Sequence, residues 1–173
     1  ATRPSGYEEK VVFNFRGNLD GFISKINTWQ SVLIPQGTQT GTFTVEFDMI
    51  PSKDIMDGIV GVLDGVATTY SNNSCIVRLN PSGKIDAYND TGYAANNELV
   101  YHGGMTYHVK MDIDAVNMSY DVYANEQGGD VVEIGKDFKF RRKITHLDYW
   151  SMVAGNFNLA DPGTHRVLNM QIT

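Results

Sequence analysis

Short runs in which apolar and polar residues alternate recur along the chain. The clearest is 42–50, where every second residue from Phe43 to Met49 is apolar and most residues between them are polar. The stretches 106–113 and 117–124 repeat this alternation. A period of two predicts strands with one face in a core and the other toward solvent. No stretch shows the sustained period of a long helix.

Turn-forming residues separate these runs, as at 51–53, 89–92, 102–104 and 127–130. Many short strands divided by turns predict an all-β fold, with antiparallel sheets packed face to face. The predicted strands cover residues 10–15, 31–34, 42–50, 58–64, 74–80, 84–88, 98–101, 106–113, 117–124, 131–139, 145–151 and 165–172.

Length and composition narrow the class. The chain has 173 residues, 42% of them hydrophobic, which is enough for one sizeable core. We expect residues 1–9 to be a linker or terminal remnant and 10–173 to form a single domain. The net charge is −6 and no long basic run stands out, so nucleic-acid binding is not expected. No apolar run reaches the ~18 residues of a membrane span.

The single cysteine, Cys75, excludes a disulfide within the chain. Its place in the middle of a predicted strand favours a small buried side chain. No signal peptide is visible, and we expect the chain to be a module excised from a longer protein.

The order of several segments resembles the concanavalin A-like, laminin-G-like jelly roll. The resemblance implies an all-β jelly-roll sandwich of two antiparallel sheets. The segments are VVFNF (11–15), TFTVEFDMIPS (42–52), GIVGVLDG (58–65), TYHVKMDID (106–114), SYDVYAN (119–125) and VLNMQIT (167–173).

More narrowly, residues 56–62, 70–89, 93–97 and 101–108 resemble a module appended to secreted microbial polysaccharide lyases and other cell-wall-degrading enzymes. No single motif is diagnostic, and the order of the pieces carries the resemblance. It implies a secreted, extracellular, non-catalytic carbohydrate-binding module. Such a module would tether a covalently linked catalytic domain to plant or algal cell-wall polysaccharide.

Residues 75–88, CIVRLNPSGKIDAY, predict a hairpin whose three-residue loop is Pro81-Ser82-Gly83. This loop places Arg78 opposite Asp86 and Asn80 opposite Lys84. It also predicts the pairs Leu79–Ile85, Val77–Ala87 and Ile76–Tyr88. One face of the hairpin is then apolar, and the other carries Arg78, Asn80, Asp86 and Tyr88.

This polar face suits a sugar. Arg78 can donate to hydroxyls or to a uronate carboxylate, and Asp86 can hold it rigid. Asn80 can donate and accept, and Tyr88 offers a ring with a polar tip. The alternative is a surface ion pair beside an exposed tyrosine, contributing about 0–1 kcal/mol to stability.

Three further aromatic residues are candidate ligand contacts. Tyr70 precedes the hairpin, and Tyr93 lies in the predicted loop after it. If Leu147 and Tyr149 face the core, Trp150 points outward and can stack on a sugar. Packing in the core or a loop is an equally good explanation for each of the three.

The chemical class of the ligand stays open. Arg78 favours an acidic glycan of the pectin or alginate type, whereas the net charge of −6 favours a neutral one. A structural calcium ion is common in jelly-roll binding modules, and it takes oxygen ligands. Candidate donors are Asn18, Asp20, Asp112, Asp114 and Asp161, although their spacing matches no defined calcium loop.

Two enzymatic alternatives depend on other residues. Glu46 and Asp48 resemble part of the carboxylate strand of related jelly-roll glycosidases, but Met49, Ile50 and Pro51 follow and the second glutamate is absent. A jelly-roll lyase would need a histidine and a tyrosine beside a residue that neutralises the uronate.

Arg78, Tyr88 and either His102 or His108 are the residues of this chain that could form such a lyase set. A lyase or hydrolase therefore stays the first alternative. An adhesion module of the laminin-G type is the second.

Overall fold

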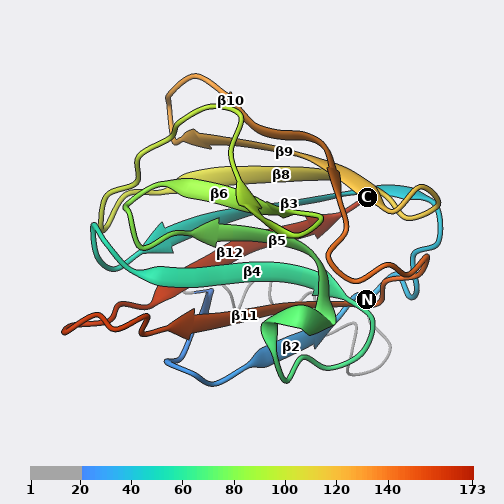
Figure 1. Cartoon of the computed structure of the whole chain (residues 1–173), viewed down its shortest axis with the longest axis horizontal. Coiled ribbons are helices and arrows are strands. Elements are labelled where there is room, and N and C mark those ends of the chain that lie inside the picture. Colours follow the sequence, from blue (N-terminus) through green and yellow to red (C-terminus); the bar gives the residue numbers. More distant parts are fainter. Residues whose placement is uncertain (1–20) are drawn as a thin grey trace.

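The structure, a computed structural model, describes residues 21–173, and within them two antiparallel sheets of six strands pack face to face (Figure 1). The first sheet has the order β1-β12-β3-β8-β9-β10, and the second has the order β2-β11-β4-β5-β6-β7. The strands of the first sheet are β1 (Phe22–Ile23), β3 (Thr42–Pro51), β8 (Tyr107–Asp114), β9 (Ser119–Glu126), β10 (Val132–Lys139) and β12 (His165–Ile172). The strands of the second are β2 (Gln30–Leu33), β4 (Asp57–Leu63), β5 (Asn73–Leu79), β6 (Ile85–Asn89), β7 (Gly92–Ala94) and β11 (Tyr149–Gly155).

The chain passes back and forth between the sheets, because β1, β3 and β12 lie in the first and β2, β4 and β11 in the second. One short 3₁₀ helix, η2 (Tyr70–Asn72), leads into β5. This architecture confirms the predicted jelly-roll β-sandwich. None of the helices in the described part of the chain is long and apolar enough to cross a membrane.

The predicted alternation of strand faces is confirmed in the first sheet. The apolar residues of β3 from Phe43 to Met49 are buried between the sheets, and the residues between them are partly exposed. Strands β8 and β9 follow the same rule. The sheets bury these inner faces in one shared core, which is the main hydrophobic contribution to the fold.

The second sheet is buried on both faces at its centre. Ile59 of β4, Ile76 of β5 and Val153 of β11 form a second apolar cluster apart from the main core. Each of these strands also sends residues of alternate positions into the main core, such as Val60, Val77 and Met152. Aromatic side chains cover this second cluster on the outer face of the sheet.

Two strand predictions differ from the structure, and two short strands of the structure were not predicted. The predicted strand at 98–101 is a loop with one isolated bridge, Lys84–Val100, and the strand predicted at 145–151 runs from Tyr149 to Gly155. The short strands β1 and β7 were not predicted. The predicted strand at 10–15 and the expected linker at 1–9 lie outside the described residues.

Tyr101 explains why the loop at 98–101 resembled a strand. Its side chain is fully buried, and its hydroxyl contacts the carbonyl oxygens of Met56 at 3.0 Å and Asn80 at 2.7 Å. It also accepts a hydrogen bond from the Met56 backbone N–H at 2.9 Å. Tyr101 therefore anchors a loop, whereas the prediction placed it in a β-strand.

Tyr120 of the first sheet reaches through the core to the backbone of the second. Its hydroxyl accepts a hydrogen bond from the Ile76 N–H at 3.3 Å and donates to the Tyr88 carbonyl at 2.5 Å. The β5–β6 ladder ends at Val77–Ala87, so this hydroxyl takes the place of the predicted Ile76–Tyr88 pairing. A core side chain thus fixes the backbone beneath the outer face of the second sheet.

Cys75 is fully buried in the main core, as predicted. Burial raises the pKa of its thiol well above the ordinary value, because an apolar surrounding disfavours the thiolate.

Candidate functional site

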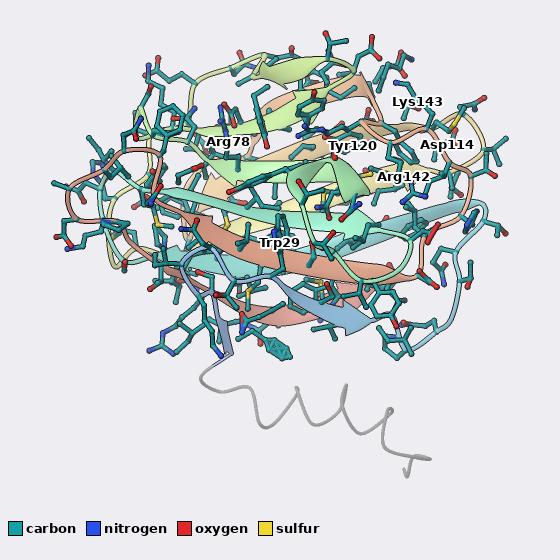
Figure 2. The ribbon with its side chains drawn as sticks, turned by 60° about the horizontal axis from the view of Figure 1, so that its bottom comes forward. Trp29, Arg78, Asp114, Tyr120, Arg142 and Lys143 are labelled. Atoms are coloured by element: carbon teal, nitrogen blue, oxygen red, sulfur yellow. The ribbon has the colours of Figure 1, made fainter. Side chains whose placement is uncertain are left out.

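The predicted hairpin forms with the predicted register. Arg78 pairs with Asp86, and Leu79 pairs with Ile85. The Asn80 N–H donates to the Lys84 carbonyl at 2.8 Å. Gly83 has φ +84°, the left-handed conformation that the loop requires. The polar face of the hairpin therefore lies on the outer face of the second sheet, where Figure 2 shows Arg78.

Asp86 holds the guanidinium of Arg78 from one side. Arg78 Nε donates to Asp86 Oδ1 at 2.9 Å, and Nη2 donates to Oδ2 at 2.7 Å. The side chains are 19% and 9% exposed, so the pair is largely shielded from water. Two parallel hydrogen bonds give the guanidinium a fixed plane.

Asn80 serves mainly the turn. Its side-chain oxygen accepts from the backbone N–H groups of Ser82 at 2.9 Å and Lys84 at 3.1 Å. Its amide nitrogen donates to Asp86 at 2.9 Å. Asn80 therefore shapes the loop and orients Asp86, and these bonds occupy most of the groups that it could offer a ligand.

Two tyrosines lie against arginines on this face. The Tyr93 ring lies against Arg78, whose guanidinium carbon is 3.6 Å from the ring centroid. Tyr93 belongs to β7 and pairs with Tyr88, whereas the prediction placed it in a loop. The two rings meet edge to face at 5.0 Å, and Arg141 lies 4.4 Å from the centroid of the Tyr88 ring. Burial raises the pKa of Tyr93 to about 12, so its hydroxyl stays neutral.

Two further aromatic side chains pack on the same surface. The ring of Tyr70 meets that of Trp29 edge to face, at 5.1 Å between centroids. We call this surface the aromatic face. It comprises four aromatic side chains packed on an apolar floor, together with four charged residues. The aromatic side chains are Trp29, Tyr70, Tyr88 and Tyr93, and the floor is Ile59, Ile76 and Val153. The charged residues are Arg78, Asp86, Arg141 over the Tyr88 ring, and Asp57 beside the Tyr70 hydroxyl.

The prediction for Trp150 is wrong. Trp150 is 2% exposed, belongs to the main core and stacks on Phe22 at 5.3 Å between ring centroids. The strand begins at Tyr149, so no continuous alternation links Leu147 to Trp150, and both residues face inward. A buried indole between the sheets cannot stack on a sugar.

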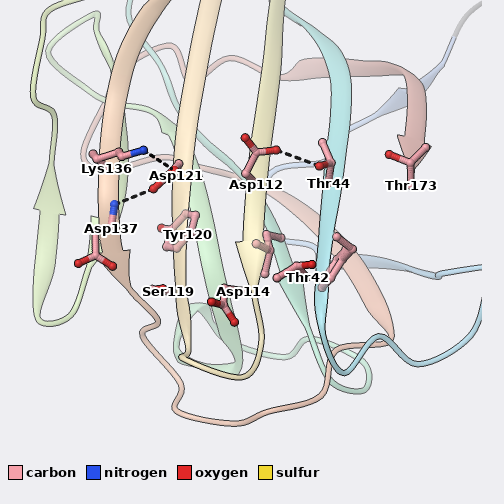
Figure 3. A pocket seen from close by; sticks show the side chains of 12 residues that line it. Thr42, Thr44, Asp112, Asp114, Ser119, Tyr120, Asp121, Lys136, Asp137 and Thr173 are labelled. Atoms are coloured by element: carbon pink, nitrogen blue, oxygen red, sulfur yellow. Dashed lines mark hydrogen bonds and ion pairs between the residues drawn. The ribbon is translucent and has the colours of Figure 1, made fainter.

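The outer face of the first sheet carries a polar groove of about 690 Å³ (Figure 3). Its side chains largely bind one another. Thr44 donates to Asp112 at 2.9 Å, and Lys136 lies 3.1 Å from Asp121. Such mutually paired groups are typical of a solvated sheet face.

Glu46 and Asp48 lie on the same sheet and bind His108 between them. His108 Nδ1 lies 2.8 Å from Asp48, and Nε2 lies 2.8 Å from Glu46. Partial burial lowers the pKa of His108, but the hydrogen bonds and charges of the two carboxylates outweigh it and raise the pKa. The two ring nitrogens serve different carboxylates, so the three groups do not converge on one reacting atom.

The lyase set considered from sequence is not assembled around His108. Arg78 and Tyr88 lie on the second sheet, and His108 lies on the first with the main core between. His102 is exposed in the loop that follows Tyr101.

The candidate calcium ligands within the described residues, Asp112, Asp114 and Asp161, are not gathered into a metal site. No group of three His, Cys, Asp or Glu side chains within residues 21–173 could hold a metal ion. Asp112 accepts from Thr44, Asp114 accepts from the backbone of the 116–117 turn, and Asp161 pairs with Lys53. Asn18 and Asp20 lie outside the described residues.

Three residues of the site were not predicted: Trp29, Arg141 and Asp57. They are distant from the hairpin in sequence, and only the tertiary fold brings them to it. Asp57 could have been suspected, because it begins the strand that pairs with β5.

Comparison of the sequence with curated proteins finds a relative, and comparison of the structure with solved structures identifies the fold. No family model matches the chain. A gellan lyase from Bacillus sp is 31% identical over 107 residues, which cover 60% of this chain and 4% of that protein. The chain thus corresponds to a small part of the curated relative.

Among solved structures, lectin UEA-II complexed with galactose has a TM-score of 0.56 and 11% identity, covering 78% of this chain and 72% of the lectin. Basic winged bean lectin with Tn-antigen has a TM-score of 0.56 and 11% identity, covering 76% and 70%. A sialidase has a TM-score of 0.55 and 14% identity, covering 84% of this chain and 15% of that one. At such identities the similarity shows the fold, which is the lectin-like, concanavalin A-like jelly roll.

Proposed function

We propose that this chain is a non-catalytic carbohydrate-binding module whose ligand lies on the aromatic face of the second sheet. The observation that supports this most is the fixed position of Arg78. Asp86 holds it by two hydrogen bonds, and the Tyr93 ring lies against its plane. Asp86 is oriented in turn by Asn80. A planar hydrogen-bond donor set in place among aromatic rings matches what a sugar needs.

The physical reason lies in the two kinds of surface that a sugar presents. Its hydroxyls need groups that already point in the right direction, because both partners lose water on binding. Its C–H patches need an aromatic or apolar plate. The aromatic face offers both on neighbouring strands of the second sheet. In the groove of the first sheet, by contrast, Thr44 binds Asp112 and Lys136 binds Asp121.

The proposed ligand is a cell-wall polysaccharide of plant or algal origin, and the proposed role is to tether a linked enzyme to it. Sequence similarity to a small part of a gellan lyase supports attachment to a carbohydrate-active enzyme. Tethering raises the effective concentration of the enzyme at its substrate without lowering a barrier. A secreted, extracellular location belongs to the same proposal.

The test compares binding of the wild type, Arg78→Ala and Lys136→Ala to a panel of soluble and insoluble wall polysaccharides. Lys136 is exposed on the first sheet, so its loss changes net charge equally and leaves the aromatic face intact. We expect retention of the wild type and Lys136→Ala by at least one polysaccharide, and loss of retention for Arg78→Ala.

Equal retention of all three proteins would contradict the location of the site. Bond cleavage by the wild type would favour the lyase or hydrolase alternative. Capture of a protein partner with no glycan bound would favour the adhesion module.

A further inference from the structure

The charged groups of the aromatic face are ordered along the strands. At one end, Asp57 of β4 pairs with Gly155 of β11. Two residues further along β4, Ile59 pairs with Arg78 of β5, and Arg78 pairs in turn with Asp86 of β6. Tyr88, with Arg141 over its ring, lies two residues beyond Asp86 along β6. At about 3.3 Å per residue, Asp57 and Tyr88 are separated by roughly 13 Å along the strand direction.

The middle of this row carries no net charge, because Arg78 and Asp86 neutralise each other. Neither end is neutralised. Among residues 21–173, no donor hydrogen-bonds to the Asp57 carboxylate and no carboxylate forms an ion pair with Arg141. The face thus has an unpaired anion at one end and an unpaired cation at the other.

The lack of a side chain at Gly155 leaves the space that the Asp57 carboxylate occupies. A Cβ atom on Gly155 would lie 2.6 Å from Asp57 Oδ2 and 2.9 Å from the Tyr70 hydroxyl. The carboxylate and the hydroxyl therefore converge over the bare backbone of Gly155. Burial raises the pKa of Asp57, with Arg78 opposing the shift, which agrees with a carboxylate that lacks hydrogen-bond donors.

We propose, on the basis of the function proposed above, that the aromatic face selects a glycan that carries both acidic and neutral sugars. The sugar over Asp57 and Tyr70 bears hydroxyls only, and a uronate carboxylate one or more sugars away lies at Arg141. Asp57 takes hydrogen bonds from sugar hydroxyls and repels a uronate. Arg141 offers a planar donor edge to a carboxylate while its other face lies on Tyr88.

This arrangement disfavours two simpler ligands. A polymer made only of uronates places a carboxylate beside Asp57, where a desolvated like charge is unfavourable. A wholly neutral polymer leaves Arg141 without its strongest partner. The charge pattern of the face is thus the pattern expected for a heteropolymer.

The test is calorimetric titration with three sets of oligosaccharides of equal length: repeats of glucuronate and glucose, oligogalacturonates and cello-oligosaccharides. We expect the wild type to bind the mixed repeats about tenfold more tightly than either homopolymer. Asp57→Asn should raise affinity for the oligogalacturonates without raising it for the mixed repeats. Arg141→Gln should remove the preference for the mixed repeats over the neutral oligosaccharides.

Other outcomes would contradict either the charge-sorted subsites or the proposed function itself. If the wild type binds all three sets equally, or if both variants keep its selectivity while Arg78→Ala still abolishes binding, the charge-sorted subsites are wrong and the binding face stands. If the wild type binds none of a wide glycan panel, the proposed function itself fails and this inference fails with it.

Discussion

The guanidinium carbon of Arg78 lies 3.6 Å from the centroid of the Tyr93 ring, and the two residues come from strands that are not neighbours in the sheet. Strand β6 lies between them, and it contributes the carboxylate of Asp86 to the same guanidinium. Three strands therefore fix one cation. Its orientation is set by the sheet before any ligand arrives, and this preorganisation lowers the entropic cost of binding.

Removing the carboxylate of Asp86 should weaken both the fold and the site. Asp86→Asn leaves a largely shielded guanidinium without its counter-charge, so we expect a loss of about 2–3 kcal/mol in the free energy of unfolding. Denaturant unfolding measures it. The control is Asp121→Asn, which breaks the exposed pair with Lys136 and should cost about 0–1 kcal/mol. Equal losses for the two variants would show that the Arg78–Asp86 pair is an ordinary surface pair.

Gly155→Ala should disturb the Asp57 end of the aromatic face without removing a polar group. The added methyl would meet the Asp57 carboxylate at 2.6 Å and the Tyr70 hydroxyl at 2.9 Å, so both must move. We expect glycan affinity to fall at least as far as with Tyr70→Phe. Gly92→Ala is the control, because its Cβ would meet no atom within 4 Å. Unchanged affinity in Gly155→Ala would exclude this end of the face from the site.

The Tyr120 hydroxyl should contribute to stability out of proportion to its size. Tyr120→Phe leaves the Ile76 N–H and the Tyr88 carbonyl without this partner inside the core, and we expect a cost of about 1–3 kcal/mol. Thermal or denaturant unfolding measures the difference from the wild type. The control is Tyr123→Phe, in the same strand but on its partly exposed face, and it should cost much less. Faster hydrogen exchange of the Ile76 amide in Tyr120→Phe would localise the effect.

His165 should make the fold less stable in mild acid. Burial lowers the pKa of this residue to about 4, whereas an unfolded chain has the ordinary value of 6.5. The unfolded state therefore binds a proton first, so stability falls as the pH drops from about 6.5 to about 4, by roughly 3 kcal/mol. The neutral ring contacts Ser24 at 2.9 Å through Nδ1 and the Ile59 carbonyl at 3.1 Å through Nε2.

Unfolding of the wild type and His165→Gln between pH 7 and pH 4 checks this expectation. The variant should start less stable and lose less over the same range. His108 acts in the opposite direction, because its raised pKa gives stability that is present below pH 6.5 and lost as the pH rises through the raised value. A His108→Gln variant therefore separates the two contributions, and an unaltered slope in His165→Gln would contradict the assignment.

The sequence predicted the parts of the fold that depend on local pattern. The two-residue period placed the core faces of β3, β8 and β9, and one loop residue, Gly83, set the register of Arg78 against Asp86. Trp150 shows where this reasoning fails. A prediction of its face needs the residue at which the strand begins, and the pattern at 145–149 starts the alternation too early.

The rest of the site depends on which strands become neighbours. Arg141 reaches Tyr88 because the segment after β10 crosses to the second sheet, where the Arg141 N–H donates to the Ser74 carbonyl at 2.8 Å. Gly155 lies beside Asp57 because β11 pairs with β4. The Tyr120 hydroxyl is a similar case, because the sequence pattern that places a tyrosine in the core does not predict which backbone groups its hydroxyl will bind. Non-local pairings of this kind are set by the sheet as a whole.

Mapping a bound glycan by NMR tests the location of the site most directly. A polysaccharide fragment that the wild type binds is titrated into isotopically labelled protein, and the backbone amide shifts are followed. We expect the changes to centre on β4, β5, β6 and β7, around Arg78 and Tyr93, and to vanish in Arg78→Ala. Shifts that centre instead on β3, β8 and β9 would place the ligand on the opposite sheet and contradict the proposed site.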